Sequence, residues 1–155
     1  MRLPVLALAT LLALPFAAAA APSEPPPAYD AALASSLGAD ARGMRQYVLV
    51  ILKTGPNKMA DGEARTAMFK GHFANMGRLA GEKKLVLAGP LDGKEGRRGI
   101  FVFNTPDIEA AQAWVATDPV VINGEMVAEY HKFYGSAALM MVNEVHGKIE
   151  KKQAP

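Results

Sequence analysis

Residues 64–91, ARTAMFKGHFANMGRLAGEKKLVLAGPL, decide the fold of this 155-residue chain. Apolar side chains recur with the period of a helix in the first part of this stretch, which then continues through a short turn into a run of apolar residues and a Gly-Pro corner. The pattern predicts a helix over residues 63–80 and a buried strand over residues 85–88. His72 lies at mid-helix among apolar neighbours, which makes it the first candidate for a functional residue.

Three further strands are expected around this unit. Residues 46–53 (QYVLVILK) and 99–103 (GIFVF) are apolar at both alternate sets of positions, which is typical of strands covered on both faces. Residues 125–134 (EMVAEYHKFY) form the last expected strand. A second helix is predicted over residues 106–117, with Thr105 as its cap and Asp118-Pro119 as its end.

The order of these elements over residues 46–134 is strand–helix–strand–strand–helix–strand. It predicts an α+β, ferredoxin-like domain with a four-stranded antiparallel sheet and two helices on one face. Because the strands are apolar on both faces, the second face needs a cover. We expect a homodimer in which two copies pack through their sheet faces. The alternative is that a helix predicted over residues 136–151 covers part of that face.

The segments outside this domain are expected to be a secretory signal, a linker and a C-terminal extension. Residues 1–21 combine Arg2, an apolar run and several small residues, which is the pattern of a cleaved secretory signal, and the run is short for a membrane-spanning helix. We therefore expect a periplasmic or secreted protein without membrane attachment after cleavage, an uncleaved anchor being the alternative. Residues 22–45 are expected to be a Pro- and Ala-rich linker, and residues 135–155 a helical extension.

Composition excludes several classes of function. The net charge is +2 with both signs interspersed, so nothing favours nucleic acid as a partner. The absence of cysteine excludes disulfides and thiol nucleophiles. The sequence has no ligand spacing for a metal, no phosphate-binding loop in a strand–loop–helix context and no serine nucleophile elbow. It therefore predicts no metal site and no cofactor.

His72 is the candidate general acid or base, because the imidazole of free histidine titrates close to pH 7. It would need a carboxylate to orient it, and Asp118, Glu82 and Asp92 are the candidates. The alternatives are that His72 is simply packed in the core with one hydrogen bond, and that Asp118 only caps and ends a helix. His131 is expected at the surface or facing a second copy.

Substrate-binding residues are expected around His72. Arg65 lies seven residues before it on nearly the same line of the helix and could hold an anionic group. Gly89 and Pro90 would shape the wall of a pocket, and Asp92 follows them at the corner. A small organic molecule is the expected ligand.

Several short motifs resemble the YciI-like (YCII-related) domain family in their order and spacing. They are QYVLVI at 46–51, His72, LVLAGPL at 85–91, AAQAW at 110–114, Asp118-Pro119 and EYHKF at 129–133. The resemblance implies a dimeric ferredoxin-like α+β barrel with a pocket near the helix histidine and a histidine–aspartate pair as the active site. It also implies that Lys83 stands where the family usually has glycine.

The family's function is largely unassigned, although one relative is a dehydrochlorinase that acts on a chlorinated aromatic. The sequence and the resemblance together predict a small enzyme with His72 and Asp118 as the catalytic residues. The alternative is a module that binds a small molecule without turnover, or a dimeric interaction module.

Overall fold

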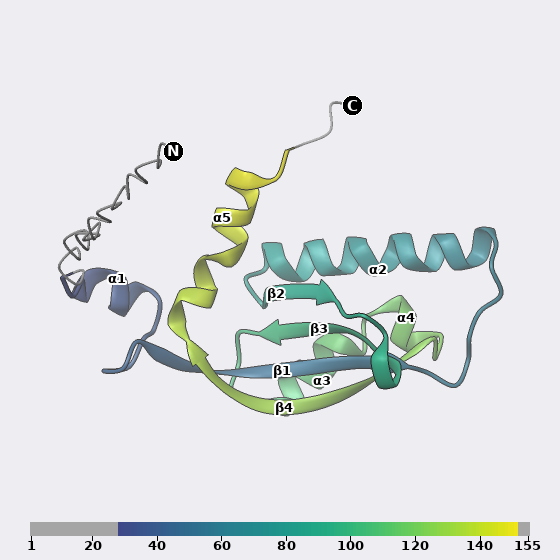
Figure 1. Cartoon of the computed structure of the whole chain (residues 1–155), viewed down its shortest axis with the longest axis horizontal. Helices are drawn as coiled ribbons and strands as arrows, with labels where there is room; N and C mark the ends of the chain where they lie inside the picture. The colour runs from purple at the N-terminus through teal and green to yellow at the C-terminus, as the bar shows by residue number, and fades with distance from the viewer. Residues whose placement is uncertain (1–27, 152–155) are drawn as a thin grey trace, which may run out of the picture.

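One antiparallel sheet organises the part of the chain that the computed structural model describes, residues 28–151. Its strands are β1 (Met44–Thr54), β2 (Leu85–Pro90), β3 (Arg97–Phe103) and β4 (Met126–Ser136), in the spatial order β2-β3-β1-β4 (Figure 1). This is the predicted ferredoxin-like α+β arrangement. The predicted signal at residues 1–21 and the beginning of the linker lie outside the described residues.

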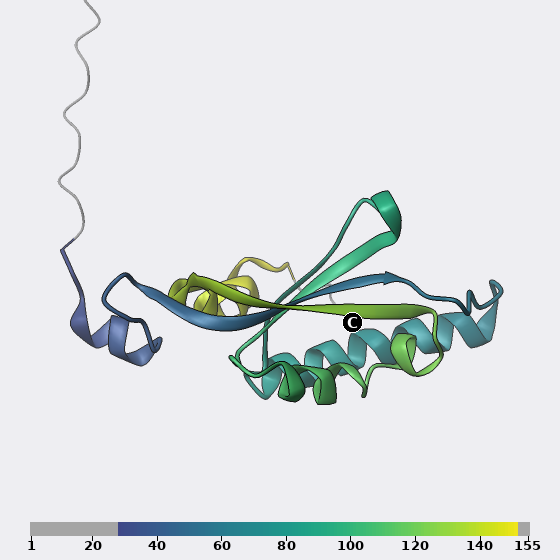
Figure 2. The same ribbon diagram turned by 90° about the horizontal axis from the view of Figure 1, so that it is seen from below.

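Three helices cover one face of the sheet (Figure 2): α2 (Glu63–Gly81), α3 (Ile108–Val115) and α4 (Pro119–Ile122). Alternate side chains of β1 and β3 point toward these helices, as the pattern of residues 46–53 and 99–103 predicts. The resulting core is formed by Val48, Val50, Leu52, Met68, Leu79, Leu85, Phe101, Phe103, Ala111, Val115, Val120 and Met126.

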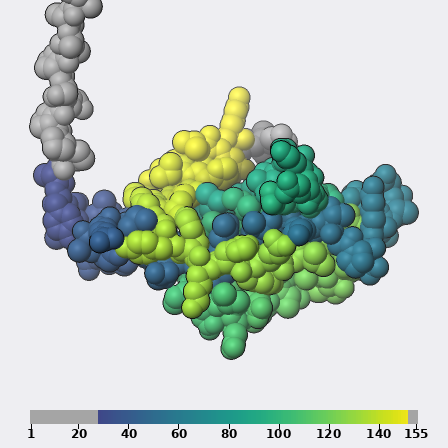
Figure 3. All heavy atoms as spheres, turned by 60° about the horizontal axis from the view of Figure 1, so that its bottom comes forward, coloured from purple at the N-terminus to yellow at the C-terminus, as the bar shows by residue number. Residues whose placement is uncertain are grey.

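The C-terminal segment covers part of the opposite face. It consists of a 3₁₀ turn, η2 (Ala137–Met141), and the helix α5 (Val142–Ile149), where a single helix was predicted. Leu139 and Met140 pack against a second buried cluster that contains Tyr47, Val86 and Val102. In Figure 3 these C-terminal residues, in yellow, gather at one part of the surface and leave β4, in light green, exposed along much of its length. The predicted homodimer through the sheet faces stays a prediction.

The smaller elements lie at the ends of this sheet. A short helix, α1 (Ala31–Ser36), precedes β1, and a 3₁₀ turn, η1 (Lys94–Gly96), connects β2 to β3. Helix α1 begins at Asp30, whose carboxylate accepts the N–H of Leu33 at 2.9 Å. No helix within residues 28–151 combines the length and the apolar character that crossing a bilayer requires.

The prediction for the second helix was wrong at both ends. Asp107, and not Thr105, caps α3, because its carboxylate accepts the N–H of Glu109 at 2.9 Å while Thr105 Oγ1 binds the N–H of Asp107. Asp118 does not end a helix but begins a new one, α4, with Pro119 at its first position. A proline at that position loses no hydrogen bond, so Asp-Pro can start a helix as well as follow one.

Helix α2 ends at a residue with a left-handed backbone. The N–H of Lys83 binds the carbonyl oxygen of Ala80 and that of Lys84 binds Leu79, both at 2.9 Å, which is a Schellman ending. Lys83 has φ +56°, a conformation that glycine adopts without the penalty paid by other residues. The departure from the family's usual glycine therefore falls at a position where glycine fits best.

We expect Lys83→Gly to raise the free energy of unfolding by about 1 kcal/mol, because it removes the left-handed strain. Urea denaturation of both proteins measures the change. Lys70→Gly, on the exposed side of the same helix, is the matched control and should lower the free energy of unfolding by somewhat less than about 1 kcal/mol. A loss of stability in Lys83→Gly would contradict the explanation.

Candidate active site

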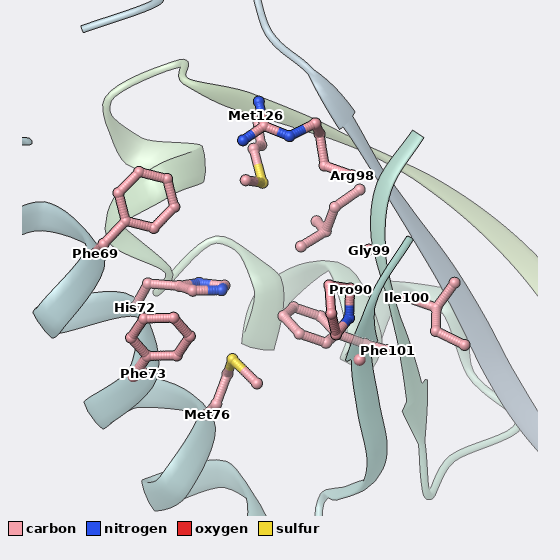
Figure 4. Close-up of a pocket in the computed structure, with 12 residues that line it drawn as sticks. Phe69, His72, Phe73, Met76, Pro90, Arg98, Gly99, Ile100, Phe101 and Met126 are labelled. Atoms are coloured by element: carbon pink, nitrogen blue, oxygen red, sulfur yellow. The ribbon is translucent and has the colours of Figure 1, made fainter. Parts of the chain in front are cut away.

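A cavity of about 260 Å³ lies between α2 and the strands β2 and β3 (Figure 4). Its walls are apolar except for two side chains, His72 and Arg98. An apolar cavity of about 150 Å³ is large enough to hold benzene, so this one has room for a single substituted ring. The lining residues are Leu52, Phe69, His72, Phe73, Met76, Gly89, Pro90, Arg98, Gly99, Ile100, Phe101 and Met126.

His72 is held by Asp118. The Nδ1 atom of His72 lies 2.9 Å from Oδ1 and 2.8 Å from Oδ2 of Asp118. Both side chains are buried, with exposed fractions of 7% for His72 and 1% for Asp118. A carboxylate in this position accepts a hydrogen bond from Nδ1–H, which leaves Nε2 as the nitrogen available to a ligand. Figure 4 shows the ring projecting from α2 into the cavity.

Asp118 reaches His72 because α4 can approach α2 closely. A Cβ atom on Gly71 would lie 3.1 Å from Cγ of Pro119, so a side chain at position 71 would require the proline to shift by a few tenths of an ångström. Gly71 and Pro119 are the chain neighbours of His72 and Asp118, and their contact therefore brings the two functional side chains together. Asp118 is further fixed by its cap, since Oδ1 accepts the N–H of Val120 at 3.1 Å.

Aromatic rings surround the imidazole on three sides. The ring centroid of His72 lies 5.3 Å from that of Phe73, 6.1 Å from that of Phe101 and 6.2 Å from that of Phe69. These contacts restrict the rotation of the imidazole and keep water away from much of its surface. The hydrogen bond to Asp118 therefore operates in an apolar environment, where electrostatic interactions are stronger than in water.

Arg65 lies next to the cavity but does not line it. Its Nη2 atom binds Glu125 Oε1 at 2.8 Å, and Glu125 Oε2 accepts the N–H of Met59 at 2.7 Å. The hydrogen bonds from Arg65 and then from Met59 hold the pKa of Glu125 below its usual range. Glu125 is only 1% exposed, so this pair joins α2 to the segment before β4 from inside the protein.

The other predicted site residues separate into two groups. Gly89 and Pro90 line the cavity wall. Asp92 does not, because it is exposed in the turn after β2, where its carboxylate accepts the N–H of Lys94 at 3.1 Å. Glu82 is engaged in ion pairs with two neighbouring basic side chains at the surface. Of the three candidate carboxylates, the structure brings only Asp118 to His72.

Arg98 is a cavity residue that the sequence analysis missed. The strand predicted over residues 99–103 begins two residues earlier, at Arg97. The position of Arg98 depends on an irregularity in strand pairing, for which the sequence carries no recognisable signal. Among residues 28–151, no three histidine, aspartate or glutamate side chains come together in a way that could hold a metal ion.

The fold and the site define an α+β ferredoxin-like domain with a buried histidine–aspartate pair at an apolar pocket. Residues 46–133 match the YCII-related domain, and the chain belongs to that family. No curated protein matches the chain. Among solved structures, it is similar to 5-chloro-2-hydroxyhydroquinone dehydrochlorinase from Burkholderia phenoliruptrix AC1100 in complex with 2,5-dihydroxybenzoquinone. That similarity has 17% identity and a TM-score of 0.43, and it covers 56% of this chain and 92% of the other.

Proposed function

We propose that this protein is a small enzyme in which His72 acts as general base and general acid on a small organic molecule bound in the cavity. The observation that carries the proposal is the contact of His72 Nδ1 with both oxygens of Asp118, at 2.9 and 2.8 Å, beside a cavity that the same imidazole lines. A histidine packed only for stability needs neither a buried carboxylate nor access to a cavity.

The chemistry that suits this arrangement is proton abstraction from carbon. Nε2 of His72 takes a proton from the ligand, and Asp118 stabilises the imidazolium that forms. The electron pair of the broken C–H bond then forms a double bond. In an isomerisation, the imidazolium returns the proton to another carbon; in an elimination, a leaving group departs with its own electron pair.

Hydrogen–deuterium exchange tests the proposal without knowledge of the natural substrate. In D₂O, proton NMR follows the loss of the benzylic protons of phenylpyruvate, a single-ring compound with acidic C–H bonds. The wild type should accelerate exchange by at least about 100-fold over His72→Gln. His131→Gln is the matched control, because His131 is exposed on β4 and does not line the cavity. Equal rates for the wild type and His72→Gln would contradict the proposed role of His72.

A binding module without turnover is the second candidate. It is favoured by the predominance of apolar side chains in the cavity, which would suit a ligand held mainly by burial. In that case His72→Gln would weaken ligand binding, and neither protein would exchange the ligand's protons. Binding and exchange measured on the same pair of proteins separate the two functions.

The place of action and the assembly are part of the same proposal. Export to the periplasm or the medium is supported by the composition of residues 1–21. The mass of the exported chain should correspond to cleavage within residues 17–21. A homodimer is supported by Leu49 and Ile51, which are half-buried on β1, a strand that is apolar on both faces, and by Val127 on the neighbouring β4, which is 43% exposed. Light scattering should give twice the mass of one chain.

A further inference from the structure

Arg98 reaches the cavity because of a β-bulge. In the pairing of β1 with β3, Leu52 is opposite Gly99 and Lys53 is opposite Arg97, so Arg98 is the extra residue without a partner. A bulge changes the direction of the side chain at that point and is found frequently next to active sites. Arg97 is exposed, whereas Arg98 lines the cavity together with Gly99.

Within the part of the chain that the structure describes, the guanidinium group of Arg98 has no hydrogen-bond acceptor. Within residues 28–151 its side chain makes no hydrogen bond and no ion pair, whereas Arg65 binds Glu125 and Arg97 binds Glu95, each at 2.8 Å. The charge of Arg98 contributes to the lowered pKa of Glu125, but the two oxygens of Glu125 are already taken by Arg65 and by the backbone of Met59. A guanidinium offers five donors in a planar fork that matches a carboxylate.

Arg98 and His72 lie on different sides of the same apolar space. Figure 4 shows His72 projecting from α2, and Arg98 running from β3 toward Met126, with Phe101 on the opposite wall from the helix. A ligand that meets both polar side chains must therefore have an apolar body between two polar ends. The cavity volume of about 260 Å³ limits that body to one ring.

We propose that the cavity selects small hydrophobic carboxylates, with the carboxylate bound by Arg98, a single ring lying between the aromatic side chains, and the reacting carbon at His72. The assignment deepens the proposed function and rests on it only for the reaction at His72. Binding of the carboxylate depends on Arg98 alone, so the two claims can fail separately.

Benzoate and benzamide are the probes, because they have nearly the same shape and differ in charge. Isothermal titration of the purified protein should show benzoate binding that weakens by about tenfold or more in Arg98→Met, while the weaker binding of benzamide stays the same. Arg97→Met is the matched control, since Arg97 is the adjacent residue and does not line the cavity. It should bind benzoate as the wild type does. Melting temperatures verify that both variants are folded.

A third variant separates this proposal from the proposed function. His72→Gln should still prefer benzoate to benzamide, even where it no longer exchanges the protons of phenylpyruvate. If His72→Gln exchanges protons at the wild-type rate but keeps this preference, only the enzyme proposal fails. The carboxylate proposal is overturned if benzoate shows no saturable binding at millimolar concentrations, if benzamide binds as tightly as benzoate, or if Arg98→Met and the wild type bind benzoate equally well.

Discussion

Asp118→Asn is expected to reduce proton transfer by His72 by on the order of 10³–10⁴-fold while leaving the fold intact. The size of the effect follows from the orientation that the side-chain amide of the introduced asparagine adopts. Oδ1 of Asp118 accepts the N–H of Val120, caps α4 and lies 2.9 Å from His72 Nδ1, while Oδ2, which has no other partner within residues 28–151, lies closer to Nδ1, at 2.8 Å. Asparagine is as good a cap as aspartate, so its oxygen will keep the place next to Val120.

The amide nitrogen of the substituted side chain would then face His72 Nδ1 and donate to it. This hydrogen bond favours the tautomer with the proton on Nε2, which is unable to accept a proton from a ligand in the cavity. Nitrogen chemical shifts of the His72 ring report the tautomer directly, and the exchange of phenylpyruvate protons reports the activity. A variant that retains the wild-type tautomer and the wild-type rate would contradict the role given to Asp118.

Asp107→Asn is the matched control for this experiment. Asp107 caps α3 in the same way that Asp118 caps α4, but it is Asp118 that is hydrogen-bonded to His72. Its replacement should change neither the tautomer of His72 nor the rate of exchange. A loss of activity in Asp107→Asn would indicate that disturbing a helix cap is sufficient to disturb the site.

Glu125→Ala should lower the free energy of unfolding by about 2 kcal/mol at pH 7, because it removes a buried carboxylate that accepts a hydrogen bond from the partly exposed Arg65. The N–H of Met59 also loses its acceptor. Glu129→Ala is the control, since Glu129 forms an exposed pair with Lys53 at 2.7 Å. Its replacement should lower the free energy of unfolding much less, because exposed ion pairs contribute little. Urea denaturation of the three proteins at pH 7 measures both changes. Equal losses in the two variants would contradict the importance of burial.

The same pair predicts how stability depends on pH. The pKa of Glu125 is lowered in the folded protein, chiefly by Arg65, relative to the ordinary glutamate value of 4.5. Its contribution is therefore fully present above about pH 4.5 and is lost as the pH falls through the lowered pKa of the folded state. The stability difference between the wild type and Glu125→Ala should shrink in acid. A difference that stays constant from pH 7 to about pH 3 would show that the charge of Glu125 has no part in it.

Most of the fold could be predicted because strong local patterns agree with it. Residues 46–53 and 99–103 are apolar at both alternate sets of positions, which is typical of strands inside a sheet. The start of the second helix was harder to predict, because Thr105 and Asp107 are both good caps and lie two residues apart. The four-residue helix α4 was missed since Asp118-Pro119 is compatible with the end of one helix and the beginning of another.

The candidate site was only partly accessible from the sequence. His72 stood out as a polar residue on an apolar helix face, and the family resemblance led to the prediction of Asp118 as its partner. From the residues alone, Glu82 and Asp92 were equally open, because the choice needs to know which segment packs there. That segment is α4, which packs closely because Gly71 has no side chain where Pro119 meets α2. Arg65 was taken for a ligand-binding residue because it lies on the same line of the helix as His72. In the structure the guanidinium group of Arg65 forms an ion pair with Glu125.

The bulge in β3 also makes the length of a hairpin a determinant of what the cavity can hold. Removing one residue between β2 and Gly99 would restore regular alternation, and the position now occupied by Arg98 would turn to the opposite face of the sheet. The lining would then lack its guanidinium, although no cavity residue had been substituted. Within this fold, a one-residue deletion in a surface turn is thus a route from a cavity with a cationic end to one that accepts uncharged ligands.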